Sequence, residues 1–430
     1  MRHTRGYIHK FDTKAQFDTA RANDYVEPWL SYTESEAKVD YNKGLLETPL
    51  TFEITGGGNI VWKAYNTAYT VTLEYKKNDG EWTSITSTTG GTTIPVVSGD
   101  TVQFRGNNAT MTSGSSRYNC FSGTSCQFNV KGNIMSLVDN TGYISTTTLE
   151  SAYIFNRLFT YCTGLTDASK LLLPATTLKD YCYYYMFSNC TNLLKAPSIP
   201  ATTLAQRCYS NMFRSCTSLT TAPALPVTTL ASGCYYNMFY GCTSLTTASE
   251  LPATTLASEC YYNMFYGCTS LTTAPQLPAT TLATYCYDYM FKGCTNLTTA
   301  PELPATTLAS NCYSYMFQNC TSLTTAPELP AITLANSCYR SMFNGCTNLT
   351  TAPELPATTL ANQCYENMFS GCTSLNYIRC FATDISATYC TSGWVSGVSS
   401  TGTFVKNSLM ASWSTGTNGI PSNWTVQDAS

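Results

Sequence analysis

The chain repeats a 26-residue unit, and this period constrains the fold more than any other feature of the sequence. The stretch from Cys234 to Leu256 reads CYYNMFYGCTSLTTASELPATTL, and one period later the chain reads CYYNMFYGCTSLTTAPQLPATTL. Eight full copies follow one another without an insertion, and their first cysteines run from Cys182 to Cys364. A fixed period of this length predicts a solenoid, in which each unit buries its apolar side chains against its neighbours.

Each unit contains the block Cys-Tyr-x-x-Met-Phe-x-x-Cys, followed by a Thr-rich segment that is interrupted by Leu-Pro. The first Cys, the Met and the second Cys lie four residues apart, a spacing that predicts a short helix with one buried side. Threonine suits β-ladders, so the Thr-rich segment predicts two short strands. Each coil is therefore expected to be strand, turn, strand and helix, and at about 4.8 Å per coil the array makes a rod of roughly 40 Å.

Shifts in composition predict four parts and a fold that is mainly β with short helices. Residues 1–47 are a polar N-terminal arm for attachment. Residues 48–145 contain short alternating runs such as TFEI, TVTLEYK and TVQFRG, separated by turn signals, and predict a β-sandwich of six or seven strands. Residues 146–378 are the solenoid, with an imperfect first copy before the eight full ones, and residues 379–430 are a C-terminal cap.

The 21 cysteines allow three interpretations. Zinc binding is disfavoured, because seven residues separate the two cysteines of a unit and the array contains no histidine. Disulfides between successive coils are sterically conceivable. We favour buried free thiols, because a free cysteine behaves as a small apolar side chain and a column of identical thiols packs evenly. Cys120 and Cys126 close a small loop if oxidised, and buried thiols are an equally good interpretation there.

Catalysis finds little support in the sequence, and no cofactor or metal is expected. The only histidines are His3 and His9, so a nucleophile paired with histidine cannot be assembled on the body of the protein. Paired carboxylates could serve a glycosidase, and one glutamate column exists: Glu250, Glu302, Glu328 and Glu354. We interpret these as solvated turn residues, because Ala224 and Gln276 occupy the same place in other units.

The charge and hydropathy of the sequence limit the classes of partner that the protein is expected to bind. Only 11% of residues are charged and the formal net charge is -3, which argues against nucleic acid as a partner. No run of 18 apolar residues occurs, so membrane insertion is not expected. The first residues contain no apolar run typical of an export signal, so the chain is expected to be made and folded in the cytoplasm.

The run GCTSLTTAPELPATTLASNCYSYMFQNC resembles the bacterial surface-protein A (BspA) type of leucine-rich repeat. The resemblance covers about residues 146–430, and it implies a scaffold for adhesion and recognition rather than an enzyme. The tail resembles the C-terminal cap of such arrays and contains Trp394, Phe404, Trp413 and Trp424.

The front of the chain carries a looser resemblance. The segments YIHKFDTKAQFDTA and YVEPWLSYTESEAKVDYNK are similar to the virion-proximal end of fibre or accessory structural proteins from phages of Bacteroides-type gut bacteria. This resemblance implies that the arm binds other virion proteins and that the protein is located on the virion. Phage proteins leave the cell by lysis, which is compatible with the expected cytoplasmic synthesis.

Candidate ligand-binding residues come from comparing the internal copies. The Cys, Tyr, Met-Phe and Leu places hardly change, whereas the residue before the first Cys, the second residue after it and the residue after Met-Phe vary. These places are expected to face outward. Tyr and Asp side chains suit sugar or protein surfaces, although drift at exposed positions would produce the same variation. The candidate site is Tyr236, Tyr240, Tyr262, Tyr266, Tyr285, Asp288 and Lys292.

Our leading hypothesis is a non-enzymatic phage virion protein of the fibre or accessory fibre type. It would adhere through its repeat rod to a host surface polysaccharide or protein, with glycans favoured. The alternative is a bacterial BspA-like adhesin on the cell surface, and a carbohydrate-active enzyme is a distant third. A homo-oligomer is compatible with the sequence.

Overall fold

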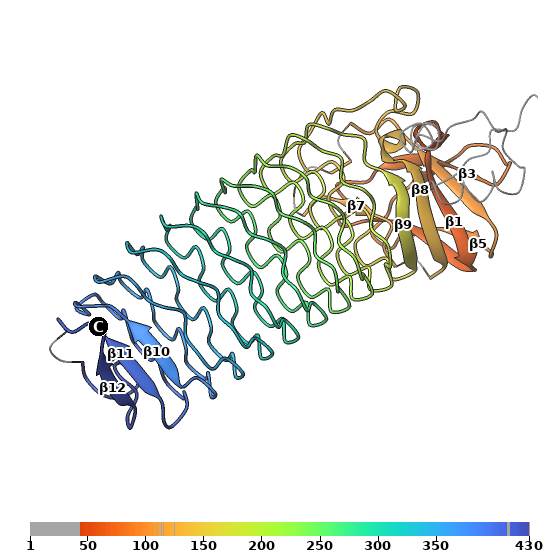
Figure 1. Ribbon diagram of the computed structural model, residues 1–430. Helices are drawn as coiled ribbons and strands as arrows, with labels where there is room; N and C mark the ends of the chain where they lie inside the picture. Colours follow the sequence, from red (N-terminus) through yellow and green to blue (C-terminus); the bar gives the residue numbers. More distant parts are fainter. Residues whose placement is uncertain are drawn as a thin grey trace, which may run out of the picture.

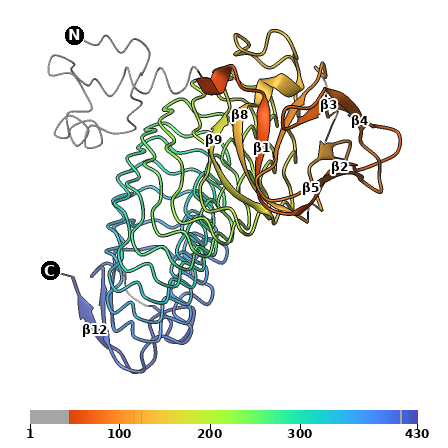
Figure 2. The ribbon, with the colours of Figure 1, turned by 90° about the vertical axis from the view of Figure 1, so that its right-hand side faces the viewer.

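The computed structural model describes residues 44–109, 111–112, 114, 116–123, 125–410 and 413–429. The predicted arm, residues 1–47, lies almost wholly outside these residues. The molecule is elongated: a β-rich part lies at one end, the repeats form stacked coils, and a small sheet closes the other end (Figure 1). The view turned by 90° shows the same stacking along one axis (Figure 2). Within the described part of the chain, no helix is both long and apolar enough to cross a bilayer.

The N-terminal part contains two sheets. The larger has the strand order β4-β3-β6-β1-β8-β9 and the smaller the order β5-β2-β7. The strands are β1 (Leu50–Gly56), β2 (Gly58–Ala64), β3 (Thr72–Lys77), β4 (Thr83–Thr86), β5 (Thr92–Val96), β6 (Thr101–Arg105), β7 (Asn119–Cys120), β8 (Gln127–Asn133) and β9 (Leu165–Leu172). Six runs of the sequence alternate in hydropathy: TFEI, NIVWKAY, TVTLEYK, TTIPVV, TVQFRG and CQFNVKG. They coincide with β1, β2, β3, β5, β6 and β8, while β4 and β7 are additional.

The larger sheet continues from the N-terminal part into the array. Strand β9, in the first coil, pairs in parallel with β8, whereas β1, β3, β4 and β6 pair in antiparallel. A 3-10 helix, η1 (Ile134–Leu137), follows β8 and is buried. The aromatic core is also continuous, because Phe121 stacks on Phe159 of the first coil at 5.8 Å between ring centroids, and Phe159 stacks on Phe187 at 5.3 Å. The N-terminal sheets therefore cover the first coil.

The block between the two cysteines of each unit is a succession of turns, so the prediction of a short helix there is wrong. In the coil that begins at Cys234, alternate amides make turns: Met238 donates to the Tyr235 carbonyl and Tyr240 to the Asn237 carbonyl, both at 3.1 Å. The amides between them bond to the next coil, as Asn237 does to the Tyr262 carbonyl at 2.9 Å. Every second amide thus joins neighbouring coils, which an α-helix cannot do because its amides bond within the helix.

The turns require a left-handed backbone at every fourth residue. In the same coil φ is positive at Gly233 (59°), Asn237 (55°) and Gly241 (71°). Glycine and asparagine adopt this region more readily than other residues. The sequence signal for turns in this coil was therefore the Gly and Asn residues at four-residue intervals, a spacing that also matches the helical pattern of the apolar residues. The signal is incomplete over the array, because other coils place residues such as Tyr285 and Tyr289 at the left-handed positions.

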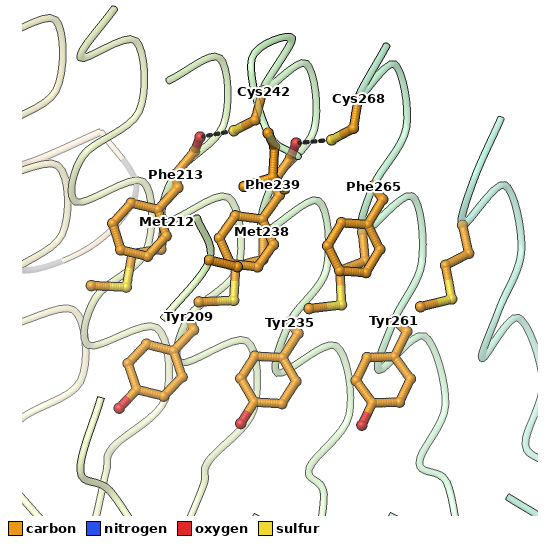
Figure 3. Packing of buried hydrophobic residues seen from close by; sticks show 14 of the residues in the cluster. Tyr209, Met212, Phe213, Tyr235, Met238, Phe239, Cys242, Tyr261, Phe265 and Cys268 are labelled. Atoms are coloured by element: carbon orange, nitrogen blue, oxygen red, sulfur yellow. Dashed lines mark hydrogen bonds between the residues drawn. The ribbon is translucent and has the colours of Figure 1, made fainter. Parts of the chain in front are cut away.

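The core of the array consists of columns of identical side chains (Figure 3). The first Cys, Tyr, Met, Phe, second Cys and Leu of each full unit are at most 1% exposed. Rings of successive coils stack nearly parallel, as in Phe213 and Phe239 at 5.7 Å and Tyr209 and Tyr235 at 6.0 Å. The Thr-rich segment forms isolated parallel bridges between coils, such as Thr299 with Thr325.

The C-terminal end of the rod is closed by a parallel three-stranded sheet of β10 (Tyr377–Cys380), β11 (Thr403–Lys406) and β12 (Thr425–Asp428). Trp394 is fully buried and contacts Phe369, the last ring of the Phe column, at 6.3 Å. Its indole N–H donates to the Gly419 carbonyl at 2.8 Å. The tail thus covers the last coil with large aromatic side chains, and the described part of β12 is exposed along its whole length.

Candidate functional site

Two of the positions that were expected to face outward lie two and six residues after the first cysteine of each coil, although the first of them is buried where it holds Ser210, Asp288 or Ser314. In the coil that begins at Cys234 these are Tyr236 and Tyr240, both half-buried, whereas Tyr235 and Met238 are buried. Because successive coils superpose, equivalent positions form columns along the rod. In the middle of the array the structure brings four of the predicted residues together as two stacked pairs, although they project from turns and not from helices.

Four tyrosine rings follow one another along the rod as two stacked pairs, and we name this row the long rail: Tyr236, Tyr262, Tyr289 and Tyr315. The first two centroids lie 4.7 Å apart with planes 2° from parallel, and the last two lie 4.3 Å apart at 3°. Between Tyr262 and Tyr289 the distance is 5.8 Å and the planes are tilted by 55°. At this step the rail passes from the second to the third position after the first cysteine.

An arginine closes each end of the long rail. The guanidinium of Arg207 lies 4.6 Å from the centroid of the first ring, and that of Arg340 lies 5.7 Å from the centroid of the last. Cations are attracted to the faces of aromatic rings. Both arginines are also paired with carboxylates, Arg207 with Glu259 and Arg340 with Glu366, the latter at 3.2 Å.

A second stack, the short rail, consists of Tyr240 and Tyr266, whose ring centroids lie 4.6 Å apart. The guanidinium of Arg214 lies 4.4 Å from the first ring, and the ammonium group of Lys292 lies 5.4 Å from the second. The same ammonium group lies 4.9 Å from the ring of Tyr289. Lys292 therefore connects the end of the short rail to the middle of the long rail.

The ring faces of both rails are occupied by other rings and by cations. This arrangement does not leave them open for stacking on the rings of successive sugar units. The parts of the rings that remain for a ligand are their edges and hydroxyl groups. Burial raises the pKa of Tyr236 and of Tyr266, so these phenols stay protonated near neutral pH and act as hydrogen-bond donors.

Asp288 and Tyr285, also predicted for the site, belong to neither ring stack, although Asp288 lies near enough to Tyr262 and Tyr289 of the long rail to interact with them electrostatically. The Asp288 side chain is only 3% exposed, and one of its carboxyl oxygens has no hydrogen-bond partner among the described residues. Burial raises the pKa of this carboxyl to about 8, so it is mostly neutral at pH 7. Tyr285 belongs to neither rail and is 38% exposed, with a φ of 59°.

The predicted site omits five residues of this surface: Tyr289, Tyr315, Arg207, Arg214 and Arg340. The three arginines occupy the variable places that were expected to face outward, but they were not chosen as site residues. The two tyrosines lie at the third position after the first cysteine, which was not considered. That position varies as well, with Asn263, Tyr289 and Ser341 in different coils. The variation was visible in the internal copies, but the contact from Tyr262 to Tyr289 depends on how one coil is placed on the next.

All 21 cysteines are buried thiols in the structure. Those of the second column donate to a carbonyl of the preceding coil, as Cys242 does to Phe213 and Cys268 to Phe239, both at 3.1 Å (Figure 3). Burial raises the pKa of Cys242 to about 12, which keeps the thiol protonated and unreactive. These cysteines therefore both fill space and bridge adjacent coils.

Other chemistry-bearing groups remain dispersed in the part of the chain that the structure describes. No cluster of three or more His, Cys, Asp or Glu side chains there could hold a metal ion. The four glutamates of the repeat turns are exposed. Glu328 and Glu354 line an open hollow of about 430 Å³ with prolines of the same turns, and Glu354 is paired with Arg379 at 3.3 Å. The two histidines lie outside the described residues.

Comparison with known proteins agrees with this architecture over the array. Residues 137–272 and 235–350 match the family model of the BspA type leucine rich repeat region, in six copies. This part of the chain is thus a BspA-type leucine-rich repeat region, and such repeats are generally interaction scaffolds without enzymatic activity. No curated protein matches the chain.

Proposed function

We propose that this protein, whose array consists of BspA-type leucine-rich repeats, is a non-enzymatic adhesion rod that binds a glycan on a host cell surface through its two tyrosine rails. The observation that carries the proposal is the alignment of six half-buried tyrosines along one side of the array. Repeats of this type are typical of surface or adhesion proteins, and the rails give this rod a distinctive chemical surface.

The scaffold does not require tyrosine at the rail positions. Ser210 and Ser314 occupy the place of Tyr236 in other coils, and Gln318 and Ser370 occupy the place of Tyr240. The buried Tyr235, in contrast, has a tyrosine at its place in every full copy. The rails are therefore additions to a uniform core, which favours a role in recognition.

The exposed edges of the rails suit a sugar chain. Stacked rings place their hydroxyl groups in a row with a step close to the coil spacing, and each protonated phenol can donate to a sugar oxygen. The rings are held on both faces, so they lose little conformational entropy on binding. A pre-ordered row of donors along a rigid rod fits an extended glycan better than a compact ligand.

The attachment of the rod is the second part of the proposal. On the resemblance of its N-terminal segment, we place the protein on a phage particle, where that segment would bind other virion proteins. A BspA-like adhesin on a bacterial surface remains the alternative. Both share the recognition role of the rails.

Binding of the purified protein to host-type gut bacteria tests the recognition role. Replacing Tyr236, Tyr240, Tyr262 and Tyr266 by Phe keeps the ring stacks and removes four hydroxyl groups, so we expect cell binding to fall by at least about tenfold while the melting temperature changes little. The matched control replaces the buried Tyr235 and Tyr261 by Phe and should bind as the parent does. Equal binding by the fourfold variant would refute recognition through the hydroxyl groups.

Purified virions test the attachment. An antibody against the coils should detect the protein on intact particles, and removal of residues 1–43 should abolish its incorporation. Absence of the protein from particles, together with its presence on bacterial cells, would favour the adhesin instead.

A further inference from the structure

The cations of the rail surface differ in whether they have a carboxylate partner. Arg207 and Arg340, at the ends of the long rail, are paired with glutamates. Arg214 and Lys292, at the ends of the short rail, have no carboxylate within 4.0 Å among the described residues. The short rail is therefore flanked by two cations that form no ion pair with a carboxylate of the described chain, on a protein with a net charge of -3.

The carboxyl group nearest to Lys292 along the chain is Asp288. It is buried and, with its elevated pKa, adds little negative charge near neutral pH. The ammonium group instead lies among three rings, at 5.4 Å from Tyr266, 4.9 Å from Tyr289 and 5.8 Å from Tyr315. Ring faces attract a cation without neutralising it, so the positive charge remains available to an anion.

The groups between the two cations are also suited to negative charge. The edges of aromatic rings carry the positive part of their quadrupole, and the phenols of the short rail are donors. The ring faces, which a nucleic acid base would need for stacking, are occupied. The surface thus offers donors and positive edges and lacks stacking platforms, which favours an acidic sugar chain over single-stranded nucleic acid.

The two cations are far apart. Arg214 and Lys292 occupy equivalent places three coils apart, which corresponds to about 14 Å at roughly 4.8 Å per coil. A single sugar carboxylate cannot reach both. Only an extended chain with several anionic groups can contact both cations and the phenols between them.

From this arrangement we propose that the rail surface binds an acidic polysaccharide, with carboxylates of separate sugar units held by Arg214 and Lys292. The inference rests on the proposed glycan-binding function and names the class of its ligand. Charged hydrogen bonds between guanidinium or ammonium groups and carboxylates are stronger than neutral ones. The neutral phenols between them would bind the sugar hydroxyl groups.

The test measures binding of the full chain to immobilised polygalacturonate, hyaluronan and dextran sulfate, and to polygalacturonate whose carboxyl groups have been reduced to alcohols. We expect binding to at least one carboxylated polymer, a clear loss on carboxyl reduction, and weaker binding as salt rises. Equal binding to the reduced polymer, or no binding to either carboxylated polymer, would overturn the proposal. Preference for dextran sulfate or for an oligo-dT strand over the carboxylated polymers would also overturn it.

The variant Arg214→Gln/Lys292→Gln locates the site. Gln318 occupies the same column, so the scaffold accepts glutamine there. We expect at least about tenfold weaker binding to the carboxylated polymer. The control Lys170→Gln/Lys179→Gln removes two charges from exposed positions away from the rails and should bind as the parent does. Equal losses in both variants would show a non-specific effect of net charge and refute the site.

The outcomes separate this inference from the proposed function. If the parent protein binds host cells, and the fourfold Tyr→Phe variant does not, the recognition role of the rails stands. If the Arg214→Gln/Lys292→Gln variant then binds those cells as well as the parent does, the acidic ligand is wrong and the recognition role of the rails still stands. If the parent binds neither cells nor polymers, both proposals fail together.

Discussion

At the scale of single residues, the array is held together by side chains that contact the equivalent residues of the neighbouring coils. The second cysteine of a unit fills a buried place and donates its thiol proton to a carbonyl of the preceding coil. The buried tyrosine stacks on its copies, yet the hydroxyl groups of Tyr183, Tyr209 and Tyr235 have no partner among the described residues. Asp288 is a buried carboxyl in a column that elsewhere contains Ser, Tyr, Arg or Glu. Substitutions at these three kinds of residue should therefore change the free energy of unfolding differently: one lowers it, one raises it and one makes the change depend on pH.

Replacing Cys268 by Ala should lower the free energy of unfolding by roughly 1–2 kcal/mol. The change removes a small buried group and leaves the Phe239 carbonyl without its thiol donor. Chemical denaturation measures the change, and thiol counting in denaturant should find most of the 21 cysteines free. Eight or more disulfides in freshly alkylated protein would contradict the thiol columns.

Replacing Tyr235 by Phe should raise the free energy of unfolding by about 1 kcal/mol. The substitution keeps the ring stack and removes a hydroxyl group that is buried without a hydrogen-bond partner. Tyr236→Phe is the matched control, because its ring lies in the half-exposed long rail, and it should change stability little. A destabilised Tyr235→Phe protein would indicate that the hydroxyl group is hydrogen-bonded in solution.

Asp288 should make stability depend on pH. Its pKa is about 8 in the folded chain against an ordinary value of 3.8, so between these values the folded chain binds the extra proton. The free energy of unfolding therefore falls as the pH rises from about 4 to 8 and is insensitive to this group above that range. Asp288→Asn should match the parent near pH 4 and exceed it at pH 8 by about 2 kcal/mol or more.

Denaturation of both proteins at several pH values checks this difference. Asp180→Asn serves as the control, because Asp180 is an exposed carboxyl on the same array. Identical pH slopes for the parent and the Asp288→Asn protein would show that Asp288 ionises normally.

At the scale of the element, a succession of turns between the two cysteines of each unit, which we call the turn ladder, stands where the sequence predicted a short helix. Its amides alternate between turn bonds and bonds to the next coil, so its backbone polar groups are satisfied without an α-helix. The cost is a left-handed residue at every fourth place. The left-handed conformation costs a residue with a Cβ atom roughly 1–2 kcal/mol. Glycine has no Cβ atom, so it adopts this conformation without that steric cost.

Gly267→Ala tests the requirement for a left-handed residue. The φ of Gly267 is 69°, and an added Cβ would lie 3.9 Å from the Gly241 Cα, so the site has room and only the backbone is strained. We expect the free energy of unfolding to fall by about 1 kcal/mol. Gly267→Asn should cost less, because Asn319 adopts a φ of 60° at the equivalent place. Thermal unfolding of both variants provides the measurement, and a more stable Ala variant would contradict the turn geometry.

At the scale of the whole molecule, one core runs from the N-terminal sheets to the C-terminal cap. The core side chains of each coil pack only against those of its neighbours, so the ends need covering. Phe121 covers the Phe column at one end and Trp394 at the other, and β8 covers β9. The rails then lie on a rod whose two ends are both closed.

Removing residues 1–145 should therefore destabilise the array. The shortened chain exposes the edge of β9 and the ring of Phe159, and both favour association. We expect a lower melting temperature, dye binding to exposed apolar surface and self-association in size-exclusion chromatography. A chain that begins at residue 44 keeps the cover and should melt as the full chain does. Unchanged melting of the shorter chain would show that the first coil is stable without its cover.

The sequence alone determined the period, the identity of the core columns and six strands of the N-terminal part, because these follow from local spacing of apolar and turn residues. The four-residue spacing of Cys234, Met238 and Cys242 is compatible with a helix and with a turn ladder. Tertiary structure decided between them, because the deciding hydrogen bonds join residues 25 apart, as from Asn237 to Tyr262. The tertiary structure also decided which tyrosines form the rails. Whether Tyr262 contacts Tyr289 depends on the placement of one coil on the next, which no single unit encodes.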